Sequence, residues 1–293
     1  MGSRKIGQLM VSAGRRRFIV SFLACLLWGA GTASEASAGP REPGATTLRV
    51  YRDYVARVET RNQQGLRQGT YLWIDELPEP EKSSACAKLK QGGVVMRRLS
   101  NDEPGGTASV SGGLIHDWEG AIFIPGVKLD QVLSVLQDYN KHSMYYGPDV
   151  ESAKIETRDG DHFRVYMRFR RKKIVTVVLN TEQDVRYFSD SPTREHSRSS
   201  AVRIREVANP GTKEEKEKSA DEENGFLWQM ETWWRMEERD GGVYVQNEAV
   251  TLTRDIPAGL GWLIGPFVSS IPKETLEFTM NATREAVLGQ GKR

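Results

Sequence analysis

Cysteine and histidine are scarce in this chain. Of its 293 residues only two are cysteine, Cys25 and Cys86, and four are histidine. Cys25 lies in the apolar N-terminal segment, which leaves Cys86 alone in the rest of the chain and excludes an internal disulfide there. The histidines are far apart in the sequence, with no pair at metal-ligand spacing. The sequence also shows no catalytic motif, so we expect no metal site and no cofactor.

Long hydrophobic runs are missing after the N-terminus. The one apolar run, Phe18–Gly31, has 14 residues, fewer than the about 20 needed to span a bilayer. Five basic residues precede this run, and a small-x-small site ending at Ala38 follows it. This layout predicts a secretory signal peptide over residues 1–38, cleaved after Ala38. We therefore expect an exported protein, either periplasmic or extracellular.

The export signal leaves alternatives open. Arg15-Arg16-Arg17-Phe18 loosely fits a twin-arginine signal, so the sequence does not decide between the two export routes. Cys25 would be the modified residue of a lipoprotein, but the preceding Phe22-Leu23-Ala24 is a poor lipobox. Too little apolar chain precedes Cys25, which also disfavours that interpretation.

Neither sign of charge dominates the mature chain. Residues 1–38 contain five of the 41 basic residues and one of the 39 acidic residues. The mature chain therefore has 36 basic and 38 acidic residues, a net charge of −2. The basic balance of the full chain therefore belongs to the signal peptide. It gives no reason to expect nucleic acid as a partner.

Residues 39–112 form an N-terminal extension in our interpretation. Leu48, Tyr51, Val55 and Val58 recur at helical spacing and predict an amphipathic helix over 46–62, with Gly65 and Gly69 ending it. Short strands are expected at 71–74 and 94–96, with two helical turns over 83–91 between them. A glycine-rich linker over 100–113 then separates the extension from the rest of the chain.

The region 113–290 has a regular order of elements. A strand over 114–124 is followed by a helix from Val127 to Tyr139, and Asp159-Gly160 then joins two strands in a hairpin. Further strands are expected over 174–179, with 183–188 as a candidate continuation, and over 199–207, followed by a charged loop. A long hairpin over 226–237 and 243–254 leads to a closing helix, with Pro272 at its first turn. The whole predicts an α+β domain with about seven antiparallel strands.

This order, together with three stretches of sequence, resembles the START-like or SRPBCC superfamily of birch-pollen-allergen-like proteins, polyketide cyclases and lipid-transport domains. The stretches are Trp118–Pro125 leading into a helix, Trp234–Glu238, and Gly241–Val245 before Ile256-Pro257. The resemblance implies a helix-grip fold, in which a curved antiparallel sheet wraps around a long C-terminal helix. It implies a cavity rather than a particular reaction, because members of the superfamily carry lipids or catalyse cyclisation.

Two groups of residues are candidates for lining that cavity. In the predicted hairpin, alternation places Phe226, Trp228, Met230, Thr232, Trp234 and Met236 on one face. The segment after the first helix mixes aromatic and polar residues and is a candidate entrance. The candidate ligand-binding residues are therefore Tyr139, His142, Tyr145, Tyr146, Trp228, Met230, Trp234 and, on the closing helix, Met280. Ordinary packing of the same residues is the alternative.

The function predicted from these features is an exported, non-catalytic carrier of a hydrophobic small molecule or lipid. One alternative is a cyclase- or hydrolase-type enzyme in the same cavity, using carboxylates such as Glu231, Glu248 or Asp255, or His142 or His162. A salt bridge of Glu248 with Arg254 or Arg235 is the simpler expectation for that carboxylate.

A second alternative is a non-catalytic envelope protein whose N-terminal extension docks a partner. The cluster Arg168, Arg170, Arg171, Lys172 and Lys173 suggests a transient contact with an anionic membrane surface, or else a solvated hairpin tip. The ligand's identity and the oligomeric state do not follow from the sequence.

Overall fold

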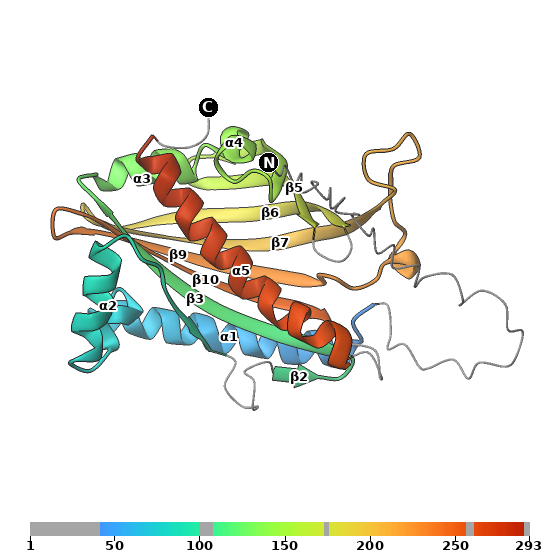
Figure 1. Ribbon diagram of the computed structural model, residues 1–293, viewed down its shortest axis with the longest axis horizontal. Helices are drawn as coiled ribbons and strands as arrows, with labels where there is room; N and C mark the ends of the chain where they lie inside the picture. The colour runs from blue at the N-terminus through green and yellow to red at the C-terminus, as the bar shows by residue number, and fades with distance from the viewer. Residues whose placement is uncertain (1–41, 100–107, 173–175, 256–260, 290–293) are drawn as a thin grey trace, which may run out of the picture. The chain divides into compact units, whose positions relative to one another are not determined.

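An antiparallel sheet organises the chain (Figure 1). The structure is a computed structural model that describes residues 42–99, 108–172, 176–255 and 261–289. The predicted signal peptide, residues 1–38, lies outside these ranges. Eight strands follow the order β1-β3-β10-β9-β7-β6-β5-β4, while β2 pairs with β3 and β8 with β7. The strands are β1 Val95–Arg98, β2 Ala108–Val110, β3 Gly113–Pro125, β4 Val150–Asp159, β5 His162–Lys172, β6 Thr176–Ser191, β7 Arg194–Ala208, β8 Lys216–Glu217, β9 Gln229–Arg239 and β10 Gly242–Arg254.

Two-residue turns fix the register of the hairpins. Asp240 and Gly241 join β9 to β10 with φ angles of 56° and 77°, so Gly242 pairs directly with Arg239. Positive φ at both turn residues matches the right-handed twist of the flanking strands, which is why Asp-Gly is favoured there. The hairpin of β4 and β5 turns through Gly160 and Asp161, of which only Gly160 has a positive φ, 57°, as a turn with glycine at its first position requires.

The helices and helical turns are α1 Ala45–Gln68, η1 Trp73–Glu76, α2 Glu81–Lys90, α3 Leu129–Leu136, η2 Tyr139–Lys141, α4 His142–Tyr145, η3 Ala220–Glu222 and α5 Gly261–Val287. The predicted first helix is confirmed and extended, since Gly65 lies inside α1 and Gly69, with a φ of 78°, caps it. The predicted strand at 71–74 is wrong, because this segment turns into η1 beneath the sheet.

The start predicted for the closing helix is also wrong. α5 begins at Gly261 and contains Pro272 in its interior. A proline removes one main-chain hydrogen bond but keeps a helical φ itself. The proline is therefore tolerated inside α5, where the packing of the long helix over β3 compensates for the lost hydrogen bond. From the sequence alone, the same residue had indicated the first turn of a helix.

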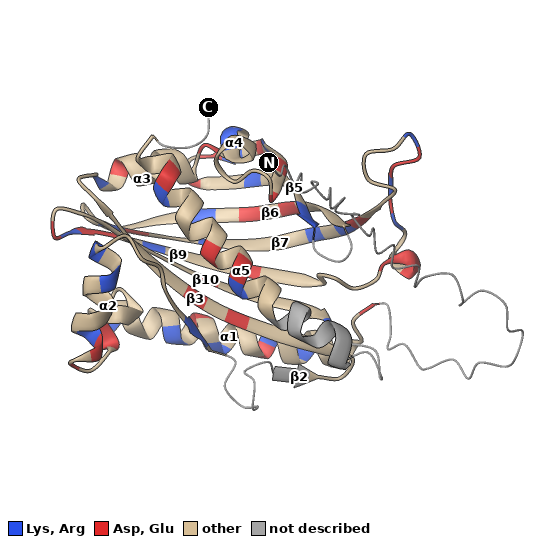
Figure 2. Cartoon of the chain, in the orientation of Figure 1, with Lys and Arg blue, Asp and Glu red and all other residues tan. Residues whose placement is uncertain are grey.

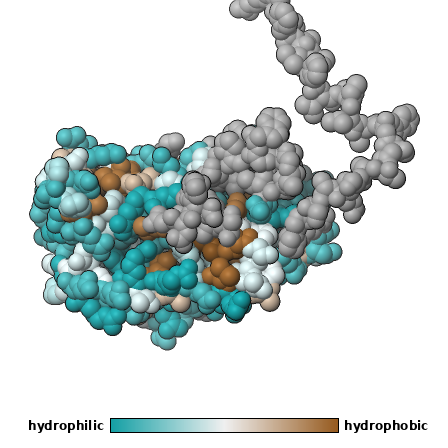
Figure 3. Space-filling view, turned by 90° about the horizontal axis from the view of Figure 1, so that it is seen from below, coloured by the Kyte–Doolittle hydropathy of each residue, from teal (hydrophilic) through white to brown (hydrophobic). Residues whose placement is uncertain are grey.

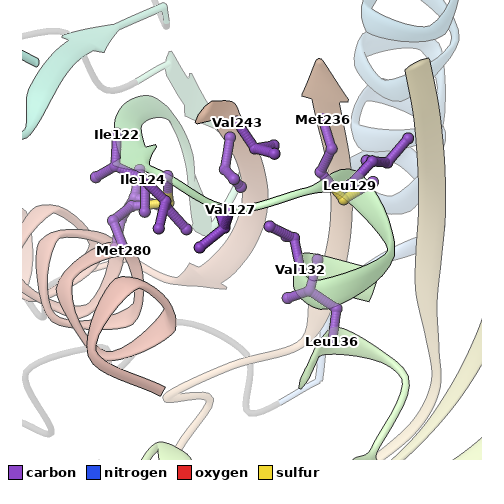
Figure 4. Packing of buried hydrophobic residues seen from close by; sticks show 11 residues of the cluster. Ile122, Ile124, Val127, Leu129, Val132, Leu136, Met236, Val243 and Met280 are labelled. Atoms are coloured by element: carbon purple, nitrogen blue, oxygen red, sulfur yellow. The ribbon is translucent and has the colours of Figure 1, made fainter. Parts of the chain in front are cut away.

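One face of the sheet, the α5 face, is covered by α5 and α3. Ile122, Ile124, Val243 and Met236 from the strands meet Met280 of α5 and the apolar side of α3 in one buried cluster (Figure 4). α5 packs directly over Gly120, since a Cβ there would lie in van der Waals contact, at 3.4–3.5 Å, with side-chain atoms of Leu276 and Met280. This is the core of the fold.

The opposite face, the α1 face, is covered by the N-terminal extension. Tyr51, Val55 and Val58 of α1 pack on Val250 and Leu252 of β10. A neighbouring cluster joins Trp73, Ile74 and Leu89 to Phe123 and Tyr244 of the sheet. Seen from the side of α1 and β2, the surface is mainly hydrophilic with separate small apolar areas (Figure 3).

The topology confirms the predicted α+β helix-grip fold, an antiparallel sheet gripping a long C-terminal helix. The seven strands expected in 113–290 are β3, β4, β5, β6, β7, β9 and β10. The strand predicted at 94–96 is confirmed as β1, and the structure adds β2 and β8. The edge strand β1 comes from the extension, so residues 39–112 and 113–290 share one sheet. The division at residue 112 stays a prediction.

Candidate functional site

The side chains on the α5 face are fully buried toward one end of the strands and only partly buried toward the other. Strand pairing aligns residues of β3, β10 and β9 in rows across this face. The row Ile122, Val245 and Met236 is fully buried. Four residues further along the strands, the row Trp118, Ala249 and Thr232 is only half-buried, although α5 crosses the same face (Figure 1). The second row is therefore covered less completely than the first, and its side chains are partly accessible to solvent.

A row of hydroxyl and amide groups lies beside these residues on β6 and β7. Ser199 Oγ donates to Gln183 Oε1 at 3.1 Å, and Gln183 Nε2 donates to Thr181 Oγ1 at 3.1 Å. Ser197 lies opposite Trp234 in the register, and its buried Oγ has no hydrogen-bond partner among the described residues. The indole Nε1 of Trp118 on β3, which β10 and β9 separate from β7, is also buried and unpartnered among the described residues. Buried polar groups are normally paired, so these two are available to a bound molecule.

The buried polar residues of β6 and β7 were not predicted from the sequence. Thr181, Gln183 and Val185 alternate along β6 in the manner of a buried strand face, and all three are buried. Polar side chains at positions that alternate with buried apolar ones indicate a polar row inside the fold, so this pattern could have predicted them.

The predicted entrance residues gather in one aromatic cluster. His142 lies with its ring centre 4.6 Å from that of Tyr139 and 4.9 Å from that of Tyr146, and Tyr145 lies 6.3 Å from His142. Tyr146 Oη lies 3.1 Å from Thr283 Oγ1 of α5, and Tyr139 Oη lies 2.9 Å from Tyr187 Oη. Burial lowers the pKa of His142 to about 4, so its imidazole is neutral at physiological pH. The cluster thus anchors the segment after α3 to α5, and its contact with a ligand stays a prediction.

The remaining predicted residues are divided between the two faces. Met230 and Trp234 lie half-buried on the α5 face, and Met280 is fully buried against them in the core of that face. Trp228 was predicted to share the face of Met230, but it packs in the cluster beneath α1. β9 begins only at Gln229, so the alternation of the strand does not extend to Trp228.

Three buried carboxylates lie on the α1 face. Glu119 and Glu248 are directly opposite each other on β3 and β10, and Asp117 is two residues from Glu119. Arg97 Nε donates to Glu119 at 2.6 Å, Tyr54 Oη donates to Asp117 at 2.8 Å, and Arg61 pairs with Glu248. The expected salt bridge of Glu248 with Arg254 or Arg235 is therefore wrong, since α1 supplies the partner.

Two of these carboxyl groups, Glu119 and Asp117, hold their protons unusually tightly. Burial, followed by the charge of Glu248, raises the pKa of Glu119 to about 7. The same two causes raise the pKa of Asp117 well above its ordinary value. The carboxylates are sealed under α1, so they do not face a molecule bound on the α5 face.

The basic cluster on β5 is neutralised within the chain. Arg168 donates to Glu151 at 2.8 Å and to Glu215 at 3.1 Å, and Arg171 pairs with Asp149. Acidic and basic segments accordingly alternate on β5 and β6 (Figure 2). Lys173 lies outside the described residues, and the predicted membrane contact stays a prediction.

Two hollows are defined on the surface of the described residues. One, of about 500 Å³, lies on the α1 face beside α1, and the other, of about 290 Å³, lies at the ends of β6 and β7. No group of three or more His, Cys, Asp or Glu side chains within the described ranges is arranged to hold a metal ion. None of the helices described is long and apolar enough to cross a membrane.

No protein-family profile and no curated protein sequence matches the chain. Among solved structures, it is similar to a STAR-related lipid transfer protein from Xanthomonas axonopodis, with 16% identity over 62% of this chain and 97% of that one, at a TM-score of 0.42. It is also similar to Ara h 8.0201, with 15% identity over 60% of this chain and 99% of that one, at a TM-score of 0.37. These scores are low, so the helix-grip assignment rests on the chain's own strand order and register.

Proposed function

We propose that the chain is an exported, non-catalytic protein that binds a hydrophobic small molecule or lipid between α5 and the sheet. The observation that supports this most strongly is the change in burial across the α5 face. Ile122 and Met236 are fully buried, whereas Trp118, Thr232 and Ala249 are half-buried under the same helix layer. A carrier needs such a mostly apolar space that is largely formed before the ligand arrives.

The neighbouring polar groups suggest the chemistry of the ligand. Ser197 Oγ and Trp118 Nε1 are buried and unpartnered among the described residues, and Ser199 lies beside Ser197 on β7. A mostly apolar molecule with a hydroxyl or carbonyl group would pair with Ser197 Oγ, and a second polar group beyond the width of β9 and β10 would pair with Trp118 Nε1. Met230 and Trp234 would supply adaptable apolar contact area.

The enzyme alternative has weaker support from the geometry. Glu231 and Glu248 lie on the α1 face, where Arg198 and Arg61 pair with them. His162 is paired with Asp184 on that same face. His142 lies in the cluster that packs on α5, and its ring is enclosed by three tyrosines.

The test is titration with the neutral fluorescent probe N-phenylnaphthylamine. We expect saturable binding by the wild-type protein at one probe per chain, and its loss in Ala249→Trp, which fills the half-buried row. Val202→Trp is the matched control, because Val202 is 51% exposed on β7. Absence of saturable binding, or equal binding by both variants, would contradict the proposal.

A further inference from the structure

The groove of about 500 Å³ on the α1 face has an ordered lining. Glu59, Asn62, Gln63 and Leu66 of α1 form one wall, and β6, β7 and β9 form the floor. The groove is separate from the proposed ligand space, because the sheet lies between them. Its volume falls within the range of small-molecule sites.

Six floor residues form two rows across the three strands. One row contains Arg235, His196 and Phe188, and the other contains Trp233, Arg198 and Arg186. The rings of Phe188 and His196 are stacked, with centres 4.8 Å apart and planes 16° apart. The guanidinium of Arg198 lies over the ring of Trp233 at 5.8 Å. Aromatic surfaces and guanidinium groups thus alternate over the floor.

The positions of Arg186 and Arg198 lower the stability of the sheet unless negative charge nearby compensates them. Arg186 and Arg198 are directly opposite each other on neighbouring strands, and like charges in such a pair destabilise a sheet. Arg198 is compensated by Glu231 at 3.2 Å and Glu59 at 3.6 Å. Arg186 pairs, among the described residues, only with Asp184 at 3.6 Å, and its side chain is 60% exposed.

Arg235 adds a buried charge to the same floor. It is 6% exposed, and its two terminal nitrogens donate at 2.9 Å to the main-chain carbonyls of Tyr71 and Asn62. No carboxylate of the described residues forms an ion pair with it. A buried charge with carbonyl partners alone favours a nearby anion.

We propose that this groove binds an oxyanion carried on a flat apolar ring, such as an aromatic carboxylate or an aromatic phosphate. Arg186 and Arg198 meet the oxyanion with charge-assisted hydrogen bonds. Phe188, which is 45% exposed, and His196 present a flat surface to the ring. Gln63 on the α1 wall donates one N–H of its amide to Glu59 at 3.2 Å and keeps its second N–H for the oxyanion.

The test is isothermal titration calorimetry of the full mature chain with naphthoate and with naphthyl phosphate. The neutral analogue naphthalenemethanol is the ligand control. We expect binding of at least one anion, weakened at least tenfold in Arg186→Gln. If naphthoate binds more tightly, the groove is selective for a carboxylate; if naphthyl phosphate binds more tightly, it is selective for a phosphate. Arg203→Gln is the matched control, because Arg203 is a half-exposed arginine on β7 outside the groove.

A second variant separates this site from the α5 face. Ala249→Trp fills the proposed ligand space on the other side of the sheet, so it should leave binding of the naphthyl anion unchanged. The inference is overturned if neither anion binds, if naphthalenemethanol binds equally well, or if Arg203→Gln weakens binding as much as Arg186→Gln does. Loss of anion binding in Ala249→Trp would also overturn it, by assigning the anion to the α5 face.

Discussion

Replacing Glu119 by glutamine should change how the stability of the protein depends on pH. Glu119 lies between sheet and α1, and its pKa is raised from 4.5 to about 7 by burial and by Glu248. The folded state therefore holds a proton that the unfolded chain releases between these two pH values. Stability from this group is complete below about pH 4.5 and is lost as pH rises through about 7.

The magnitude follows from the change in proton affinity. The rise from 4.5 to about 7 corresponds to about 3 kcal/mol, at about 1.4 kcal/mol for each tenfold change. Glu119→Gln mimics the protonated side chain at every pH. Relative to the wild type, the variant should therefore gain about 3 kcal/mol of stability between about pH 5 and pH 8.

The assay is urea unfolding of both proteins across this pH range. The difference between the two proteins is the quantity to compare, because burial lowers the pKa values of His116 and His142 to about 4 and these groups act with the opposite sign. Glu156→Gln, at an exposed position on β4, is the control and should show no such trend. A difference between Glu119→Gln and wild type that stays constant with pH would refute the reasoning.

Three further predictions concern the packing of the fold. Met280→Ala should cost about 2–5 kcal/mol in urea unfolding, because the side chain is fully buried; a loss below about 1 kcal/mol would contradict tight packing. Gly242→Ala should lower the free energy of unfolding by more than about 1 kcal/mol, because the added Cβ would lie 2.3 Å from the carbonyl oxygen of Ile124. Gly44→Ala is the control and should be nearly neutral in urea unfolding, because no atom would lie closer than 3.9 Å to its Cβ. Deleting residues 39–70 should uncover the apolar α1 face and abolish cooperative thermal unfolding, and a soluble monomer that still unfolds cooperatively would contradict this.

Local signals predicted most of the sheet. Asp240-Gly241 and Asp159-Gly160 mark hairpins through their backbone preferences, and the strands beside them alternate cleanly. These features depend on neighbouring residues alone, so they are visible in one sequence. The same alternation placed Met230 and Trp234 correctly and failed at Trp228, which precedes the strand.

Long-range partners were not predictable in the same way. Glu248 pairs with Arg61, which is 187 residues away, because α1 folds back across the sheet. Nothing near Glu248 in the sequence indicates this partner. The anion-binding groove has the same origin, since α1 and three strands distant in sequence meet only in the folded chain.

The most direct test of the central claim is native mass spectrometry of the mature protein, purified without unfolding and then extracted under denaturing conditions. The account predicts a lipid-like molecule of defined mass at close to one per chain, and its loss from Ala249→Trp. A wild-type protein that carries no such mass and also takes up no apolar probe would contradict the account, because its own side chains would then fill the space under α5.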